Sequence, residues 1–249
     1  MNSYLAEFIG TALLVLFGNG VVANVVLART KGNNGGWIVI TAGWGLAVFI
    51  GAFCAAPFSG AHLNPAVTLA MVLTGKLETT KVAGYIVAQM LGGIAGALLV
   101  FLFYREHFKA SSDADGKLAC FCTAPNIRNV PQAFFCELIG TFCLILPIFL
   151  MTDVKFNWPI GTEESHVVVG LGSLGLVPVA LLVFAIGLSL GGTTGYAINP
   201  ARDLGPRLTH AFLPVPGKRD SDWGYAWVPV AAPLAGAALA AGVQGLLHP

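Results

Sequence analysis

The chain has 249 residues, of which 56% are hydrophobic and only 10% are charged, and its formal net charge is +1. This composition excludes a water-soluble globule and predicts a protein surrounded by membrane lipid. The near-neutral balance also excludes the basic surface that nucleic-acid binding requires, so we expect no nucleic-acid partner.

Six long apolar segments are each able to cross a bilayer, which takes about 20 residues of helix. They lie at 4–28, 37–57, 82–104, 131–152, 167–190 and 223–247. The first lacks the cationic start of a cleavable signal peptide, so we expect it to stay in the mature protein. Polar connections at 29–36, 76–81, 105–130, 153–166 and 213–222 do not have the composition of domain linkers. We therefore expect one all-α membrane domain over residues 1–249.

The tripeptide Asn-Pro-Ala occurs twice, and each copy begins a short apolar helix, near 64–75 and 199–212. Asn is a preferred N-cap residue, and Pro is suited to the first helical position. Each helix covers only about half of a roughly 30 Å hydrocarbon core. Two such half-helices in corresponding places indicate a central transport site. The residues concerned are Asn64, Pro65, Ala66, Asn199, Pro200 and Ala201.

The chain repeats itself beyond these tripeptides, in two halves at about 1–104 and 131–249 that are joined by the connection 105–130. Ala6–Thr11 resembles Cys136–Thr141, and each half contains three spans and one half-helix. Because three is odd, the second half enters from the opposite side, and the N-termini of the half-helices meet near the midplane. Two positive dipole ends disfavour a cation there, whereas the asparagine amides suit a neutral hydroxyl or water.

These motifs resemble the aquaporin superfamily, also called major intrinsic proteins, and specifically its glycerol-facilitator or aquaglyceroporin branch. The stretches Ala6–Phe8, Ser59–Thr68 and Gly195–Pro206 carry the resemblance, which covers essentially the full length. It implies the aquaporin-like fold and a passive channel for glycerol, other small uncharged solutes and water that excludes protons and ions. It also implies a homotetramer in the cell (plasma) membrane with cytoplasmic termini.

The resemblance implies that four residues form the narrow selectivity filter: Trp44, Gly187, Tyr196 and Arg202. Gly187 stands where water-selective relatives carry a His, which leaves room for a carbon backbone. The aromatic rings would pack against C–H groups while Arg202 binds hydroxyl groups on the other side. Tyr196 departs from the Phe commonest in glycerol facilitators, so its hydroxyl is able to tighten or repolarise the filter.

Arg202 is unusual on physical grounds alone. A cation in the first helical turn opposes the helix dipole, and an Arg inside a membrane is costly. The corresponding residue of the first half-helix is Val67, so the repeat is broken on one side only. One alternative is that Arg202 pairs with Asp203 or reaches the membrane interface. Trp44 and Gly187 likewise have an alternative as packing residues.

Several further residues are expected to support the pore. Asp203 has the residue type of the glycerol branch, and we interpret it as bracing the adjacent loop and Arg202. Glu7 and Glu137 are acids inside apolar spans, for which proton handling is the functional alternative. The resemblance instead gives them a scaffold role, in which they accept hydrogen bonds from the half-helix loops. It also implies that the pore is lined by backbone carbonyls, those of Gly60, Ala61, His62, Tyr196, Ala197 and Ile198. For the His62 side chain, the alternative is a gate that responds to pH.

The sequence has no Walker loop, no G-x-S-x-G and no H-E-x-x-H motif, and its five His residues lack metal-ligand spacing. Three of the five Cys residues lie in apolar spans, and the C-x-C pair Cys120 and Cys122 of the long connection has oxidation or metal binding as its alternative. We therefore expect no enzymatic activity, no cofactor and no metal. The alternative function is a channel mainly for water or for urea, dihydroxyacetone, hydrogen peroxide or undissociated lactic acid. A third hypothesis, of a different class, is an ion-coupled transporter that uses Glu7 and Glu137.

The orientation in the membrane is a point of conflict. The loops on the side of the termini hold only three cations, Lys76, Lys81 and Lys155, and the other ten Lys and Arg residues lie elsewhere. Simple charge counting would place the termini outside. The resemblance places them in the cytoplasm, and we follow it because several of the ten lie in the long connection 105–130 or in the Arg202 helix.

Overall fold

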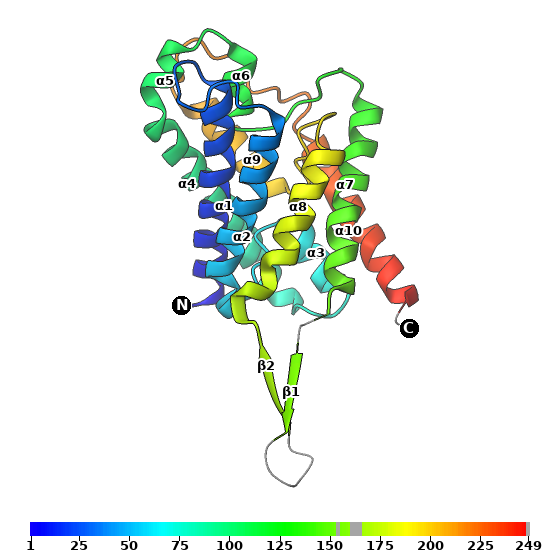
Figure 1. Cartoon of the computed structure of the whole chain (residues 1–249). Helices are drawn as coiled ribbons and strands as arrows, with labels where there is room; N and C mark the ends of the chain where they lie inside the picture. Colours follow the sequence, from blue (N-terminus) through cyan, green and yellow to red (C-terminus); the bar gives the residue numbers. More distant parts are fainter. Residues whose placement is uncertain (153–154, 160–165, 248–249) are drawn as a thin grey trace.

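A computed structural model of the chain describes residues 1–152, 155–159 and 166–247. Most of it is a bundle of upright helices (Figure 1). Within these described residues, six helices are long and apolar enough to span a membrane, which confirms the predicted all-α membrane fold. They are α1 (Ser3–Val26), α2 (Trp37–Ser59), α4 (Val82–Phe103), α7 (Val130–Leu150), α8 (Val177–Ser189) and α10 (Val228–Leu247), with α4 and α8 extended at their starts by the 3₁₀ turns η1 (Thr79–Lys81) and η2 (Gly172–Leu176).

Two short helices complete the repeat, one in each half. They are α3 (Pro65–Leu73) and α9 (Pro200–Phe212), and each begins at the proline of its Asn-Pro-Ala tripeptide. The connection 105–130 also contains two short helices, α5 (Arg105–Ala110) and α6 (Ala114–Ala119), at the end of the bundle away from the termini (Figure 1).

Two predicted boundaries were wrong, and a small element was missed. The fifth span does not begin at residue 167, because 166–170 forms a strand and helix α8 starts only at Val177. The sixth begins at Val228 instead of 223, after a run of turns. Strands β1 (Lys155–Pro159) and β2 (His166–Gly170) pair antiparallel, with Phe156 opposite Val169.

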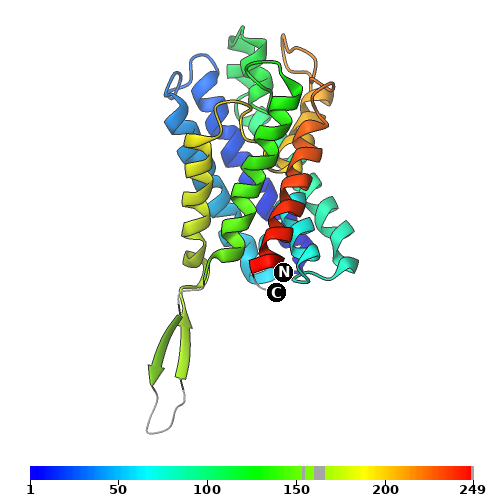
Figure 2. The ribbon, with the colours of Figure 1, turned by 90° about the vertical axis from the view of Figure 1, so that its right-hand side faces the viewer.

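The two strands project from the same end of the bundle at which both termini lie (Figures 1 and 2). The β-branched run Val167–Val169 was the available signal for a strand. The remaining parts of the predicted connection 153–166, and residues 248–249, lie outside the described part of the chain.

Glycines bring the helices of each half into close contact. A Cβ added to Gly92 of α4 would lie 2.5 Å from the Phe8 carbonyl oxygen, and one added to Gly236 of α10 would lie 2.3 Å from that of Leu138. Phe8 and Leu138 occupy the same place in the repeated segments of α1 and α7. These matched contacts show that Gly92 and Gly236 are sites of close helix contact and that both halves pack alike.

We expect Gly92→Ala to lower the unfolding temperature in detergent micelles, because its methyl group forces α1 and α4 apart at a cost of about 1–3 kcal/mol. Gly20→Ala is the matched control, since a Cβ at Gly20 of α1 would meet nothing within 4 Å. Alanine also favours the helix over glycine. Tryptophan fluorescence during heating measures both variants, and equal unfolding temperatures would contradict the assignment of Gly92 as a close contact.

Candidate pore and its constriction

The two half-helices are capped by their own asparagines. Asn64 Oδ1 accepts a hydrogen bond from the Ala66 amide at 2.8 Å. Asn199 Oδ1 accepts from the amides of Ala201 at 3.0 Å and Arg202 at 3.2 Å. The asparagine oxygens thus satisfy amides in the first turn that have no partner within the helix.

The same asparagines join the two half-helices to each other. Asn64 Nδ2 donates to the Ile198 carbonyl at 2.9 Å, and Asn199 Nδ2 donates to the Leu63 carbonyl at 2.8 Å. Each bond therefore runs from one tripeptide to the residue just before the other. Because an amide nitrogen carries two hydrogens, each asparagine retains one N–H that is not needed for this cross-link.

The loops before the half-helices are held in an unusual backbone conformation, repeated in both halves. Ala61 and Leu63 have φ of 52° and 51°, and Tyr196 and Ile198 have φ of 37° and 42°. Residues other than glycine adopt this left-handed region at a cost of about 1–3 kcal/mol each, so the surroundings must enforce it.

The buried glutamates provide that restraint. Glu7 accepts hydrogen bonds from the amides of His62 at 2.9 Å and Leu63 at 2.7 Å. Glu137 accepts from those of Ala197 at 2.9 Å and Ile198 at 2.8 Å. A carboxylate that binds two successive amides fixes the direction of that stretch of backbone, which is the scaffold geometry expected from the sequence.

Glu7 is also bound by two side chains. It also accepts from the Ser59 hydroxyl at 2.6 Å and from Gln89 Nε2 at 2.8 Å, and it is fully buried. Gln89 was missed by the sequence reading, although an amide in the apolar segment 82–104 was a signal. The His62 ring binds the Thr68 hydroxyl at 3.2 Å, so this side chain has a neighbour that satisfies it.

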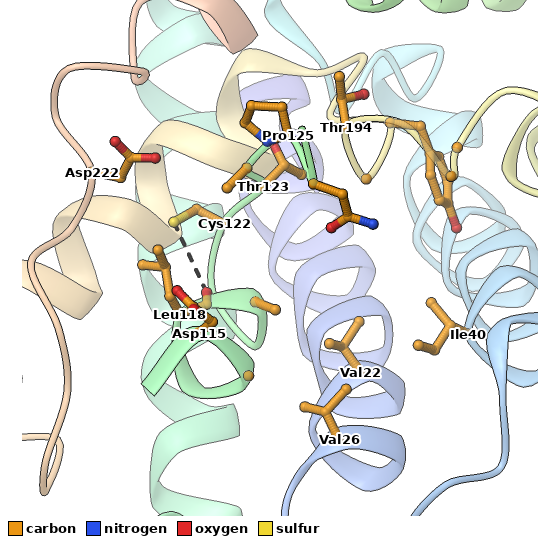
Figure 3. A pocket seen from close by; sticks show the side chains of 18 of the residues that line it. Val22, Val26, Ile40, Asp115, Leu118, Cys122, Thr123, Pro125, Thr194 and Asp222 are labelled. Atoms are coloured by element: carbon orange, nitrogen blue, oxygen red, sulfur yellow. Dashed lines mark hydrogen bonds between the residues drawn. The ribbon is translucent and has the colours of Figure 1, made fainter. Parts of the chain in front are cut away.

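Two cavities meet inside the bundle. The outer one, of about 810 Å³, opens among the connections at the end away from the termini. Figure 3 shows Val22 and Val26 of α1 together with Thr123 and Thr194 of the connecting loops on its wall. The inner one, of about 140 Å³, is lined by both capping asparagines and by the carbonyl-bearing residues Gly60, Ala61, His62, Tyr196, Ala197 and Ile198.

Three residues line both cavities and so mark the constriction between them: Trp44, Tyr196 and Arg202. The guanidinium carbon of Arg202 lies 3.9 Å from the Trp44 ring centroid. Arg202 Nη1 donates to Asn19 Oδ1 at 3.3 Å. The Trp44 and Tyr196 rings supply the apolar part of the wall and Arg202 supplies donors, so the constriction is amphipathic.

Gly187, the fourth predicted filter residue, does not line either of these cavities and lies behind Tyr196. A Cβ added to it would be 3.0 Å from Tyr196 Cζ and 2.8 Å from Thr41 Cγ2. Its carbonyl accepts a hydrogen bond from Trp37 Nε1 at 2.9 Å, and the Trp37 ring meets the Tyr196 ring edge to face at 5.9 Å. A side chain at 187 would therefore affect the pore by displacing Tyr196.

Asp203 braces the connection 105–130 and does not pair with Arg202. Its carboxylate accepts from the amide and the hydroxyl of Thr123, both at 2.7 Å, and forms a buried ion pair with Arg207 at 2.8 Å. Arg207 also donates to the carbonyls of Thr123 at 2.8 Å and Ser221 at 2.7 Å. The sequence reading missed Arg207, a fully buried cation on the same helix as Arg202.

Two ion pairs tie the outer connections together at the rim of the larger cavity. Arg128 binds Asp222 through two bonds of 2.6 and 2.9 Å, and this pairing lowers the pKa of Asp222. Arg219 pairs with Asp115. Both pairs join the connection 105–130 to residues 213–222, so the outer mouth is formed by two mutually fastened loops.

Within the described residues, His, Cys, Asp and Glu side chains form no cluster of three or more that could hold a metal ion. The five cysteines are free. Burial raises the pKa of the thiols of Cys120 and Cys122, the C-x-C pair of the long connection, so they are poor thiolate ligands.

The family described as "Major intrinsic protein" matches residues 1–244. The chain belongs to this family. It is 50% identical over 247 residues to the "Probable glycerol uptake facilitator protein" of Thermotoga maritima, covering 99% of this chain and 100% of the relative. It is 49% identical to the "Glycerol uptake facilitator protein" of Streptococcus pneumoniae strain R6, covering 96% of this chain and 97% of the relative.

Two further likenesses bear on this major intrinsic protein. The solved aquaglyceroporin from Plasmodium falciparum superposes with a TM-score of 0.81 at 31% identity, covering 99% of this chain and 96% of the other. The "D/L-lactic acid transporter" of Lactiplantibacillus plantarum is 41% identical, covering 97% of this chain and 95% of the relative. Six apolar helices and the family together identify an integral membrane protein.

Proposed function

We propose that this major intrinsic protein is a passive channel for glycerol, other small uncharged solutes and water, and that it excludes protons and ions. The observation that carries the proposal is the amphipathic constriction of Trp44, Tyr196 and Arg202 between the two cavities. A polyol has C–H groups along one side and hydroxyl groups along the other, which complement the rings and the guanidinium. The names of the two relatives that are about half identical favour glycerol among such solutes.

Ion exclusion follows from the positive charges at the half-helix N-termini and at the constriction. The N-termini of α3 and α9 each contribute about half a positive charge, and Arg202 adds a full one. The selectivity filter is accordingly assigned to Trp44, Tyr196 and Arg202, with Gly187 supporting Tyr196. The carbonyls of both loops then replace hydration along the inner cavity as a solute moves.

A channel for undissociated lactic acid is the second candidate, because one relative that is 41% identical is named for lactic acid. An ion-coupled transporter is less favoured. Glu7 would have to release its coupling ion while its oxygens hold four protein donors, and Glu137 is bound to two loop amides. We further propose one channel domain per chain, no enzymatic step, and a homotetramer in the plasma membrane with cytoplasmic termini.

Vesicles containing the purified protein test the function. In a hyperosmotic glycerol gradient we expect rapid shrinkage followed by reswelling much faster than in protein-free vesicles, because both water and glycerol cross. Fast shrinkage that persists would indicate a channel mainly for water. Uptake that stops when an ion gradient is collapsed would indicate a transporter, and faster acidification by lactic acid than by a larger acid would support the second candidate.

A further inference from the structure

Asn19 is a polar side chain in the interior of an apolar span. It lies in α1 and is fully buried, although placing an amide in a membrane helix is costly unless it is paired. Its Oδ1 accepts from Arg202 Nη1 at 3.3 Å, and its Nδ2 donates to the Phe121 carbonyl at 3.1 Å. Asn19 therefore links the first span, the long connection and the constriction.

The hydrogen bond to Phe121 fixes the orientation of the Asn19 side-chain amide. A backbone carbonyl only accepts, so the nitrogen of Asn19 must face Phe121 and the oxygen must face Arg202. The guanidinium is thus met by a neutral acceptor in a fixed orientation. Among the described residues, Arg202 Nη1 has this one side-chain acceptor, and the other guanidinium nitrogens have no protein acceptor, which leaves their N–H groups for a solute.

The Asn19–Arg202 pair takes one residue from each half of the repeat, and the equivalent positions do not form a second such pair. Asn19 and Phe149 lie the same number of residues beyond the corresponding glutamates of α1 and α7, so they are equivalent positions. Val67 and Arg202 are equivalent in the same way within α3 and α9. The polar pair Asn19 and Arg202 thus corresponds to two apolar residues, Phe149 and Val67, in the symmetry-related place. The repeat symmetry is therefore broken at both residues of the pair.

Gly18, the residue before Asn19 in α1, leaves space for Trp44, whose ring is the second contact of the Arg202 guanidinium. A Cβ added to Gly18 would lie 2.2–2.4 Å from three atoms of the Trp44 ring, so only glycine leaves space for that ring. The Arg202 guanidinium stacks on the same ring. Gly18 and Asn19 together thus set the ring below the guanidinium and the acceptor beside it.

We propose that Asn19 is a positioning residue that fixes the Arg202 guanidinium in the constriction and thereby sets the solute selectivity of the channel; the proposal rests on the function proposed above. Asn19 lines neither cavity, so it acts through Arg202 and does not touch the solute. A neutral amide holds the guanidinium without compensating its charge, whereas a carboxylate in its place would hold it and cancel the positive barrier.

Two substitutions separate the holding of the guanidinium from the preservation of its positive charge. Both variants are measured in vesicles of one lipid composition. Asn19→Leu removes the acceptor and keeps the charge of Arg202, so we expect the permeability ratio of glycerol to erythritol to fall about threefold to tenfold while proton leak stays low. Asn19→Asp loses the donor to the Phe121 carbonyl, but its carboxylate still accepts from Arg202 in a stronger, charge-assisted bond and compensates the charge. We therefore expect a ratio near that of the unmodified protein and a proton leak several-fold higher.

Asn24→Leu is the matched control on the same helix. Asn24 is half-buried, and its Oδ1 accepts from the Gly32 amide at 3.3 Å, in a turn that does not contact Arg202. We expect it to leave both the solute ratio and the proton leak unchanged. Unfolding temperatures of all variants identify any that are merely unstable, and Asn19→Asp keeps the test open if Asn19→Leu does not fold.

The other outcomes would contradict either the role of Asn19 or the proposed function. If Asn19→Leu lowers the permeability of every solute in proportion, or if both Asn19 variants match the unmodified protein in ratio and leak, Asn19 is not a positioning residue. If the unmodified protein does not conduct glycerol at all, the proposed function fails first, and that result is distinct because it needs no variant.

Discussion

Arg202→Ala is expected to produce a channel that leaks protons and no longer discriminates among polyols. The substitution removes the positive charge at the meeting point of the two cavities and the N–H donors of the guanidinium that lies over the Trp44 ring. A hydrogen bond to a charged group contributes about 1.5–3 kcal/mol, so the loss of even one should change the permeability ratio of glycerol to erythritol by tenfold or more. Stopped-flow light scattering measures the ratio, and a pH-sensitive dye trapped in the vesicles measures the leak.

Arg202→Lys separates charge from geometry at the same position. Lysine keeps the positive barrier but lacks the planar fork of donors that binds two hydroxyl oxygens together. We expect this variant to exclude protons like the unmodified protein and to lose much of the polyol discrimination. If Arg202→Ala retains both the ratio and the low proton leak, the constriction is not the selectivity filter.

The repeated elements of the fold were predictable because their causes are local. A residue type at the N-cap and proline after it are enough to begin a helix, so α3 and α9 were placed correctly at their starts from Asn64 and Asn199. The spans were predictable from hydropathy, since lipid imposes nearly the same requirement on every one of them. The unpredicted hairpin β1–β2 lies beyond the bilayer-spanning helices, where that requirement does not apply (Figure 2).

The contacts that build the pore were not predictable in detail, because they join residues distant in sequence. The bonds between Asn64 and Ile198, and between Asn19 and Arg202, each connect segments that only the folded bundle brings together. A sequence indicates that Asn19 is an isolated amide in an apolar span, but it does not indicate the partner. Gly187 shows the same limit, since its place behind Tyr196 depends on how α8 packs against the loop.

The buried ion pair of α9 shows how the outer loops and the constriction depend on each other. Asp203 and Arg207 are both completely inaccessible to solvent, and both bind Thr123. Thr123 lies two residues beyond Phe121, whose carbonyl orients Asn19. The position of Arg202 is therefore supported through a chain of contacts that ends in this ion pair.

Asp203→Leu should consequently be the most destabilising of the substitutions considered. It leaves the Arg207 charge buried without its partner and removes the acceptor of the Thr123 amide, and breaking a buried pair in this way costs about 3–5 kcal/mol. We expect a marked fall in unfolding temperature in detergent, together with a lower permeability ratio of glycerol to erythritol because the support of Asn19 is loosened.

Two comparisons make this expectation specific. Asp115→Ala breaks the Arg219 pair, whose members are 38% and 78% exposed, and should change the unfolding temperature far less. Replacing both partners, as Asp203→Leu with Arg207→Met, removes the uncompensated charge and should recover part of the stability lost by Asp203→Leu. If the double variant is stable but still has a lower permeability ratio of glycerol to erythritol, the Asp203 carboxylate acts on the constriction through Thr123. If Asp203→Leu is no less stable than Asp115→Ala, the Asp203–Arg207 pair does not support the outer half of the pore.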